Sequence, residues 1–221
     1  MNLLTASRPA TLSRLKAEFV LFYLIAPLLI ALVLPPTMMF VALFTLTAVG
    51  LALLNGTEGF EWRELLGGLE QLYFVELLAF AGGMLILCVA VVYAAAPDAA
   101  FLLLRTEPGL MLAIAVFYPI ASALPQEVVF RPLYFRRYGV FLPFGRAGLV
   151  LNAALFSLAH LMYWSWVVAL MTFAGGVIFA WAYEVRRSFA LTVVLHSLAG
   201  IVIFAVGLGI YFYSGNVQRP F

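Results

Sequence analysis

The sequence predicts an all-α fold, a polytopic bundle of about seven transmembrane helices. Hydrophobic residues make up 66% of the 221 residues and charged residues only 10%, a composition foreign to soluble domains of this size. Aromatic residues, 15% of the chain, often flank the apolar stretches, as they do at membrane interfaces. The net charge of +2 is too small to indicate nucleic-acid binding. We therefore expect the lipid bilayer, and no nucleic acid, as a partner.

Apolar stretches recur along the whole chain. They cover residues 18–34, 37–54, 72–96, 109–135, 147–163, 165–183 and 189–213. Each has about 17–27 residues, enough at ~1.5 Å per residue to cross a ~30 Å hydrocarbon core. Pro35 and Pro36 join the first two and Trp164 the fifth and sixth, so tightly that each pair should be antiparallel. Either pair could instead be a re-entrant or kinked element, so the count of seven carries an error of about one.

Basic residues predict the orientation in the membrane. With the N-terminus inside, only Arg105 and Arg219 of the 12 basic residues lie outside. The inner ones are Arg8, Arg14, Lys16, Arg63, Arg131, Arg136, Arg137, Arg146, Arg186 and Arg187. The positive-inside rule then predicts a multi-pass protein of the plasma (inner) membrane, with its N-terminus cytoplasmic and its C-terminus outside. No cleavable signal is evident.

The chain divides into three parts at this level. Residues 1–108 hold an N-terminal segment and three helices, residues 109–213 a core of four helices, and residues 214–221 a short tail.

Four glutamates and Trp62 mark the segment 58–72, which is either a short amphipathic interfacial helix or a solvated loop. Glycine pairs at 82–83 and 175–176 are expected to allow close helix packing.

A charged pair follows the apolar run at residues 109–124. Glu127 and Arg131 each cost roughly 2.5–3.5 kcal/mol at hydrocarbon depth on insertion scales. Because they are four residues apart on a helix, they lie on one face and can pair. The pair is either a functional carboxylate with its partner or a structural ion pair that pins this helix.

The only two histidines, His160 and His196, also lie in apolar stretches. Counted from the nearest arginine at the inner boundary, Glu127 and His196 lie roughly 13 Å deep and His160 roughly 21 Å deep. An irregular helix entry near Pro143 and Gly145 would reconcile these depths. We therefore predict that Glu127, His160 and His196 face one intramembrane cavity, although each histidine alone is equally well explained as a packed core residue.

These side chains are suited to hydrolysis. A glutamate and a histidine can activate one water molecule as a nucleophile, and a second histidine can stabilise the oxyanion. A peptide bond would then be cleaved without a covalent intermediate. Glu127, His160 and His196 are also a plausible zinc ligand set with a fourth position open for water. Since no HExxH spacing is present, we expect no cofactor and keep zinc as the alternative.

The order of these residues resembles a known family. The residues concerned are Gln126, Glu127, Arg131, Phe156, His160, His196 and Gly200. They resemble the motifs EExxxR, FxxxH and HxxxN of the CAAX protease and bacteriocin-processing family, which includes the type II CAAX prenyl proteases, over about residues 110–205. The resemblance implies an intramembrane endopeptidase acting on a membrane-associated peptide or protein, with Glu127, His160 and His196 as catalytic residues.

Two positions depart from the family pattern. Gln126 replaces the first glutamate, usually the general base, and Gly200 replaces the asparagine that donates to the oxyanion. Either Glu127 takes over as the base, or the chain is a relative that binds without cutting. Asn152 lies about 80° around the helix from His160 and could replace the missing amide donor.

The segment around residue 127 must deviate from a regular helix if Glu127 is the base. Adjacent helix residues point ~100° apart, so the helix must be rotated or locally unwound for Glu127 to reach the cavity. Pro125 and Pro132 bracket the segment and can disturb its hydrogen bonds. The expected supporting residues are Gln126, Arg131 and Asn152.

Two other functions stay open from the sequence. A non-catalytic membrane adaptor could be built on the same core. A small proton-coupled transporter could use Glu127 as its proton site, but the sequence shows no paired inverted halves of the kind many transporters have.

Overall fold

The structure, a computed structural model, describes residues 10–221. This part of the chain is all-helical, and no strand occurs among the described residues. The predicted all-α class is therefore confirmed. Arg8, one of the basic residues used to predict orientation, lies outside the described residues.

The helices follow one another with short connections. The first are α1 (Leu12–Val20), η1 (Leu21–Ile25), α2 (Ala26–Leu32), η2 (Pro36–Met38), α3 (Met39–Asn55), η3 (Trp62–Leu66), η4 (Leu69–Gln71), α4 (Phe74–Ala95) and η5 (Pro97–Ala99). The rest are α5 (Leu102–Thr106), α6 (Pro108–Tyr118), η6 (Pro119–Ala123), α7 (Leu124–Val128), η7 (Val129–Arg137), α8 (Gly145–Ala159), η8 (Leu161–Tyr163), α9 (Trp166–Glu184), α10 (Phe189–Val206), α11 (Gly209–Phe212) and η9 (Ser214–Asn216). Of the segments labelled η, η1, η6 and η7 are π-helical and the others are 3-10 helices.

Seven helical stretches in residues 10–221 are long and apolar enough to cross a membrane. They are Leu12–Leu32, Pro36–Asn55, Phe74–Ala95, Pro108–Arg137, Gly145–Tyr163, Trp166–Glu184 and Phe189–Val206. The predicted number of spans is confirmed, and the expected tight connections at Pro35 and Trp164 both separate successive spans. The last span is shorter than predicted because Gly207, with φ 111°, ends α10 in the left-handed conformation.

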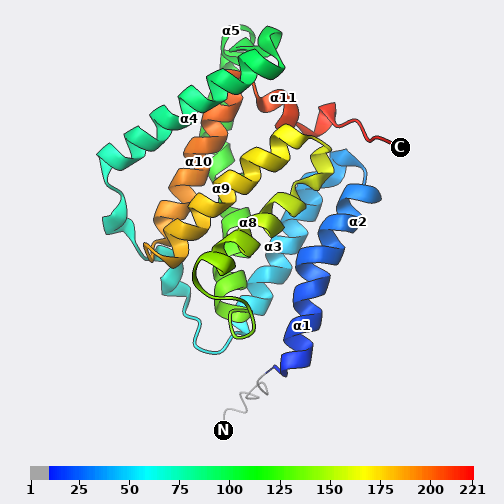
Figure 1. Ribbon diagram of the computed structural model, residues 1–221, viewed down its shortest axis with the longest axis vertical. Helices are drawn as coiled ribbons and strands as arrows, with labels where there is room; N and C mark the ends of the chain where they lie inside the picture. Colours follow the sequence, from blue (N-terminus) through cyan, green and yellow to red (C-terminus); the bar gives the residue numbers. More distant parts are fainter. Residues whose placement is uncertain (1–9) are drawn as a thin grey trace.

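Helix α10 packs against α4, α6 and α9 and lies between α4 and α9 in Figure 1. Helices α8 and α9 form a closely packed antiparallel pair joined by η8. In Figure 1, α4 lies along one edge of the bundle, and α1 and α2 lie along the opposite edge. This arrangement directs side chains from the fourth span, α8 and α10 toward a common interior.

Two arginines mark the opposite ends of the bundle. Arg137 donates to Glu18 of α1 at 2.7 Å, near the end where α1 begins. Arg219 donates to the carbonyl oxygen of Leu32, the last residue of α2. The start of α1 and the C-terminal tail thus lie at opposite ends, as an odd number of spans requires (Figure 1). Which end faces the cytoplasm stays a prediction.

The acidic segment 58–72 does not form an interfacial α-helix. It contains two short 3-10 helices, η3 and η4, separated by Gly67 and Gly68. Gly68 has φ 83°, and a Cβ atom there would overlap Ser188 at the start of α10. Only glycine allows this close turn, which interrupts any longer helix, so the segment lies between the two alternatives, with short 3-10 helices in a connecting stretch.

One of the two expected glycine packing sites is present. A Cβ atom on Gly176 would lie 2.9 Å from Cα of Ala153, so α8 and α9 approach each other closely there. At Gly82 and Gly83 a Cβ atom would meet no other atom within 4 Å. The expectation of close packing at that second pair is wrong, because it lies on a face of α4 that no other described helix covers.

Candidate active site

The fourth span carries the candidate site on a distorted helix. Its α-helical parts, α6 and α7, alternate with the π-helical segments η6 and η7. Pro119, Pro125 and Pro132 lack the amide hydrogen that a regular α-helix needs, and π-helical turns change which residues share a face. The local departure from a regular helix predicted from the prolines is therefore present, and it decides where Gln126 and Glu127 point.

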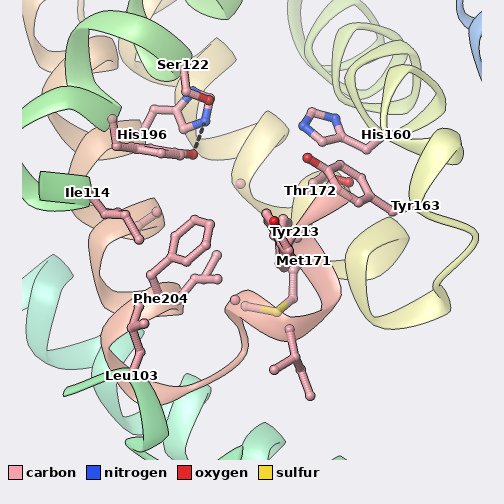
Figure 2. A pocket seen from close by; sticks show the side chains of 18 of the residues that line it. Leu103, Ile114, Ser122, His160, Tyr163, Met171, Thr172, His196, Phe204 and Tyr213 are labelled. Carbon is pink, nitrogen blue, oxygen red and sulfur yellow. Dashed lines mark hydrogen bonds between the residues drawn. The ribbon is translucent and has the colours of Figure 1, made fainter. Parts of the chain in front are cut away.

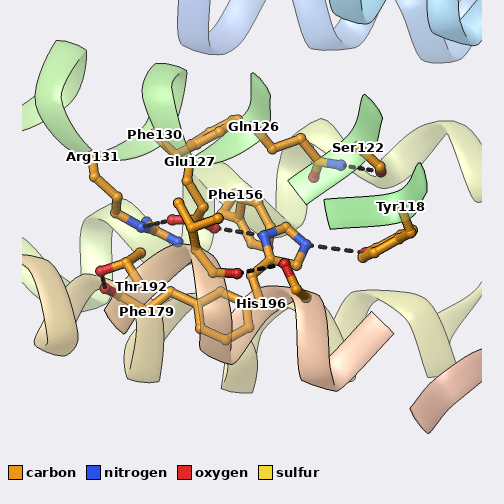
Figure 3. Close-up of polar contacts among 12 residues, drawn as sticks. Tyr118, Ser122, Gln126, Glu127, Phe130, Arg131, Phe156, Phe179, Thr192 and His196 are labelled. Carbon is orange, nitrogen blue, oxygen red and sulfur yellow. Dashed lines mark hydrogen bonds and ion pairs between the residues drawn. The ribbon is translucent and has the colours of Figure 1, made fainter. Parts of the chain in front are cut away.

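Glu127 and Arg131 form a fully buried ion pair (Figure 3). Nε of Arg131 donates to Oε2 of Glu127 at 2.7 Å, and both side chains are 0% exposed. Arg131 also donates through Nη1 to Oδ1 of Asn152, whose Nδ2 donates to the carbonyl oxygen of Phe130 at 2.7 Å. The predicted pairing is confirmed, and Asn152 ties the pair to α8.

The second oxygen of Glu127 is bound to His196. Nδ1 of His196 lies 2.6 Å from Oε1 of Glu127, which comes 69 residues earlier in the chain. An ionised carboxylate can only accept, so Nδ1 carries the hydrogen and the neutral ring has its lone pair on Nε2. The imidazole stacks on Phe179 at a centroid distance of 4.8 Å and an interplanar angle of 12°. Glu127 and Phe179 together hold the orientation of this ring.

A cavity of about 650 Å³ lies inside the bundle and is lined mainly by apolar side chains (Figure 2). The fourth span, α8 and α10 give it a group of hydrogen-bonding side chains. These are Tyr118, Ser122, Gln126, His160 and His196. We call these five residues the polar face of the cavity, whose other walls are mainly apolar.

His160 lies at the C-terminal cap of α8 and reaches this polar face. Its Nδ1 lies 2.7 Å from the carbonyl oxygen of Phe156, so Nδ1 donates and Nε2 holds the lone pair of the neutral ring. The Phe156 ring contacts both histidines, at centroid distances of 4.6 Å to His160 and 5.6 Å to His196. The two imidazoles are no farther apart than the sum of these distances. The expected convergence of the two histidines is thus found, despite their different estimated depths.

Two predicted residues lie behind the cavity wall. Glu127 does not line the cavity, because it is fully buried and its two oxygens are bound to Arg131 and His196. Asn152 is fully buried as well, and its amide is bound to Arg131 and to the Phe130 carbonyl. The expectations that these two side chains face the cavity are wrong. Gln126 faces the cavity in place of Glu127.

Tyr118 and Ser122 belong to the polar face but were not among the residues predicted from the sequence. With Gln126 they follow each other at intervals of four residues along the fourth span. Nε2 of Gln126 donates to Oγ of Ser122 at 3.0 Å, and the Tyr118 hydroxyl lies 3.2 Å from Nε2 of His196 (Figure 3). The four-residue spacing of polar side chains in an apolar helix was the signal that could have identified both.

A smaller cavity of about 110 Å³ lies between α2, α3 and the fourth span. Ser122, Gln126 and His160 line both cavities. These three side chains therefore lie at the boundary between the two cavities.

The side chains of Glu127, His160 and His196 are not placed to bind one metal ion together. Among residues 10–221, no group of three or more His, Cys, Asp and Glu side chains is placed to hold one. Glu127 already binds Arg131 and His196, whereas a catalytic zinc site usually needs three protein ligands. The geometry gives no support to zinc held by Glu127, His160 and His196.

The comparisons with known proteins agree with the motif order. Residues 108–202 match the family described as Type II CAAX prenyl endopeptidase Rce1-like. No curated protein and no solved structure matches the chain. The matched range contains the complete polar face and the buried ion pair, so the family resemblance is confirmed where the site lies. Together with the seven spans, the match describes a multi-pass membrane protein whose residues 108–202 resemble the Rce1-like family of type II CAAX prenyl endopeptidases.

Proposed function

We propose that this protein is an intramembrane endopeptidase that hydrolyses a peptide bond of a membrane-associated substrate with an activated water molecule. One observation carries the proposal. His196 binds a buried carboxylate through Nδ1 and belongs to the polar face of a membrane-embedded cavity. A histidine held in this way by a carboxylate is a common arrangement for a general base.

In this proposal His196 is the base and Glu127 acts through it. The carboxylate accepts the Nδ1 hydrogen, which keeps the lone pair on Nε2 and favours the imidazolium that forms when Nε2 takes a proton. Glu127 is then a positioning residue, because it has no contact with the cavity. Arg131 and Asn152 support Glu127 from the other side.

His160 is assigned to the water molecule. Its Nδ1 is engaged by the Phe156 carbonyl, so its Nε2 is the nitrogen that can accept a hydrogen bond from the nucleophile. Gln126 is assigned to the substrate, because an amide cannot take up the proton of a water molecule. Its Oε1 is buried without a partner in the described part of the chain and can accept from a peptide N–H group.

The proposed reaction is balanced without a covalent intermediate. One proton of the water passes to Nε2 of His196 as the water oxygen bonds to the peptide carbonyl carbon. The imidazolium then returns that proton to the peptide nitrogen as the C–N bond breaks. A carboxyl terminus and an amine leave, and His196 regains its lone pair.

The second candidate is a membrane adaptor that binds a peptide without cutting it. The observation in its favour is the amide of Gln126, because the polar face then holds no carboxylate. The transporter hypothesis gains nothing from the structure, since Glu127 is held by two partners away from the cavity.

Purified protein in lipid nanodiscs, incubated with a library of membrane-associated peptides, tests the proposal. We expect cleavage by the wild type and its loss in His196→Gln, Glu127→Gln and His160→Ala. Glu18→Gln is the matched control, because Glu18 also pairs with an arginine, Arg137, but lines neither cavity.

Two results would contradict the assignment. Full cleavage by Glu127→Gln would show that the carboxylate does not act through His196. An inactive wild type that gains cleavage on Gln126→Glu would identify a decayed protease and favour the adaptor.

A further inference from the structure

Gly200 and Tyr118 occupy complementary positions on two neighbouring helices. A Cβ atom on Gly200 of α10 would overlap the ring and hydroxyl of Tyr118, which ends α6. Both residues line the large cavity. Tyr118 can therefore hold its present position only because residue 200 has no side chain.

The position of Tyr118 brings its hydroxyl to the reactive side of His196. The hydroxyl lies 3.2 Å from Nε2, and the phenol ring packs edge-on against the imidazole at a centroid distance of 6.0 Å (Figure 3). The Phe204 ring also packs edge-on against the phenol ring, at a centroid distance of 6.0 Å. With Nδ1 bound to Glu127, Nε2 is the nitrogen on the cavity side, and the Tyr118 hydroxyl already occupies it.

We propose that Tyr118 is a catalytic residue that relays the proton of the attacking water to His196, an inference that rests on the proposed endopeptidase function. A hydroxyl donates one hydrogen and still accepts through its second lone pair, so it can bridge Nε2 and a water molecule in the cavity. Gly200 makes the relay possible by leaving the space that the Tyr118 ring fills.

The relay conserves atoms and charge. The phenol proton moves to Nε2 of His196 while a proton of the water moves to the phenol oxygen, and the water oxygen bonds to the peptide carbonyl carbon. When the C–N bond breaks, Tyr118 gives its proton to the leaving nitrogen and receives the imidazolium proton. Tyr118 ends the cycle unchanged, and the water has been divided between the two products.

Tyr118→Phe removes the hydroxyl and keeps the ring that fits against Gly200. We expect kcat to fall roughly 10²–10⁴-fold, the usual contribution of a proton-transfer group, while KM changes less than about twofold. The matched control is Tyr211→Phe, because Tyr211 lines neither cavity and its hydroxyl donates to the carbonyl oxygen of Ala95. The control should keep kcat within about twofold.

Solvent deuterium provides a readout that a purely structural role would not change. A two-proton relay predicts a curved dependence of kcat on the deuterium fraction for the wild type, and a straight line for Tyr118→Phe. Gly200→Ala should displace the ring and lower kcat, and the double variant with Tyr118→Phe should lose little beyond Tyr118→Phe alone. Thermal melting checks that each variant is folded.

The contact itself can be tested without activity, because the sequence has only two histidines. In ¹⁵N-histidine spectra of tag-free protein, Tyr118→Phe should shift the Nε2 signal of His196 and leave both His160 signals in place. An unchanged Nε2 signal overturns the contact. An unchanged kcat in Tyr118→Phe overturns the relay but not the proposed endopeptidase function. A raised kcat also overturns the relay and shows that the Tyr118 hydroxyl blocks the base. A wild type that cleaves nothing overturns the proposed function and the relay with it.

Discussion

Nδ1 of His196 lies 2.6 Å from Oε1 of Glu127, so the fourth and seventh spans are joined by a hydrogen bond inside the membrane-spanning bundle. The other oxygen of the carboxylate binds Arg131, and the arginine binds Asn152 of the fifth span. Three spans that are separate in sequence therefore meet at one carboxylate. The stability of the bundle and the orientation of His196 depend on the same group.

Arg131→Leu should strongly reduce the amount of folded protein. It leaves Glu127 buried without its cation, which typically costs about 3–5 kcal/mol. Changing Glu127 and Arg131 to leucine together should recover part of this loss, since the unpaired charge is then absent. Size-exclusion profiles and thermal melting in detergent measure both variants. Arg63→Leu is the control, because the Arg63–Glu61 pair is exposed and should contribute little. Normal yield of Arg131→Leu would show that the buried pair does not form.

Gly176→Ala should destabilise the bundle by about 1–3 kcal/mol, the usual range for an overpacked contact. The added methyl group would press on the backbone of Ala153 and separate α8 from α9. Gly83→Ala is the matched control, because its methyl group meets no other atom within 4 Å and alanine favours a helix. Equal melting temperatures for the two variants would contradict the close contact between α8 and α9.

The two ends of the bundle should lie on opposite sides of the membrane, with the N-terminus cytoplasmic. The described chain has seven spans, and basic residues dominate the predicted inner segments. A phosphatase fused after residue 221, which folds only outside the cytoplasm, should be active, and a fluorescent protein that folds only inside should stay dark. The reverse pattern would show that the orientation is wrong.

Peptide cleavage should survive removal of metal ions. The described part of the chain has no group of three suitable ligands, and the carboxylate of Glu127 is already bound twice. Activity after dialysis against EDTA should equal that of a sample dialysed against buffer. Loss of cleavage that zinc alone restores would show that His160 and His196 rearrange to bind a metal ion.

The spans and the pairing of Glu127 with Arg131 could be predicted from the sequence because each depends on local features. Apolar length identifies a span, and a four-residue interval brings two side chains onto one helix face. The side of the cavity wall on which Glu127 lies could not be predicted in this way. It depends on the π-helical turns at 119–123 and 129–137, which contain Pro119 and Pro132 and change the rotation of the helix there.

The contact between Tyr118 and Gly200 could not be predicted from the sequence either. From the sequence, Gly200 could be interpreted only as the loss of an amide donor. The side chain that fills the space beside it, Tyr118, comes from another helix. Asn152 was expected to face the cavity because of its angle to His160, whereas its Oδ1 accepts from Arg131 and its Nδ2 donates to the Phe130 carbonyl behind the cavity wall. Both errors come from the packing of one helix on another, which periodicity along a single helix does not contain.

The cavity is lined both by residues 108–202, which match the family, and by segments on either side of them. Its polar face lies within residues 108–202, but much of its apolar wall comes from segments on either side, among them Met39, Phe80, Leu102 and Tyr213. In the proposed endopeptidase, the reaction chemistry thus lies within residues 108–202, whereas the flanking segments contribute to the shape of the substrate site. A chimera that keeps 108–202 and exchanges the flanking segments with those of a relative should retain its bond-breaking chemistry while accepting peptides of a different size.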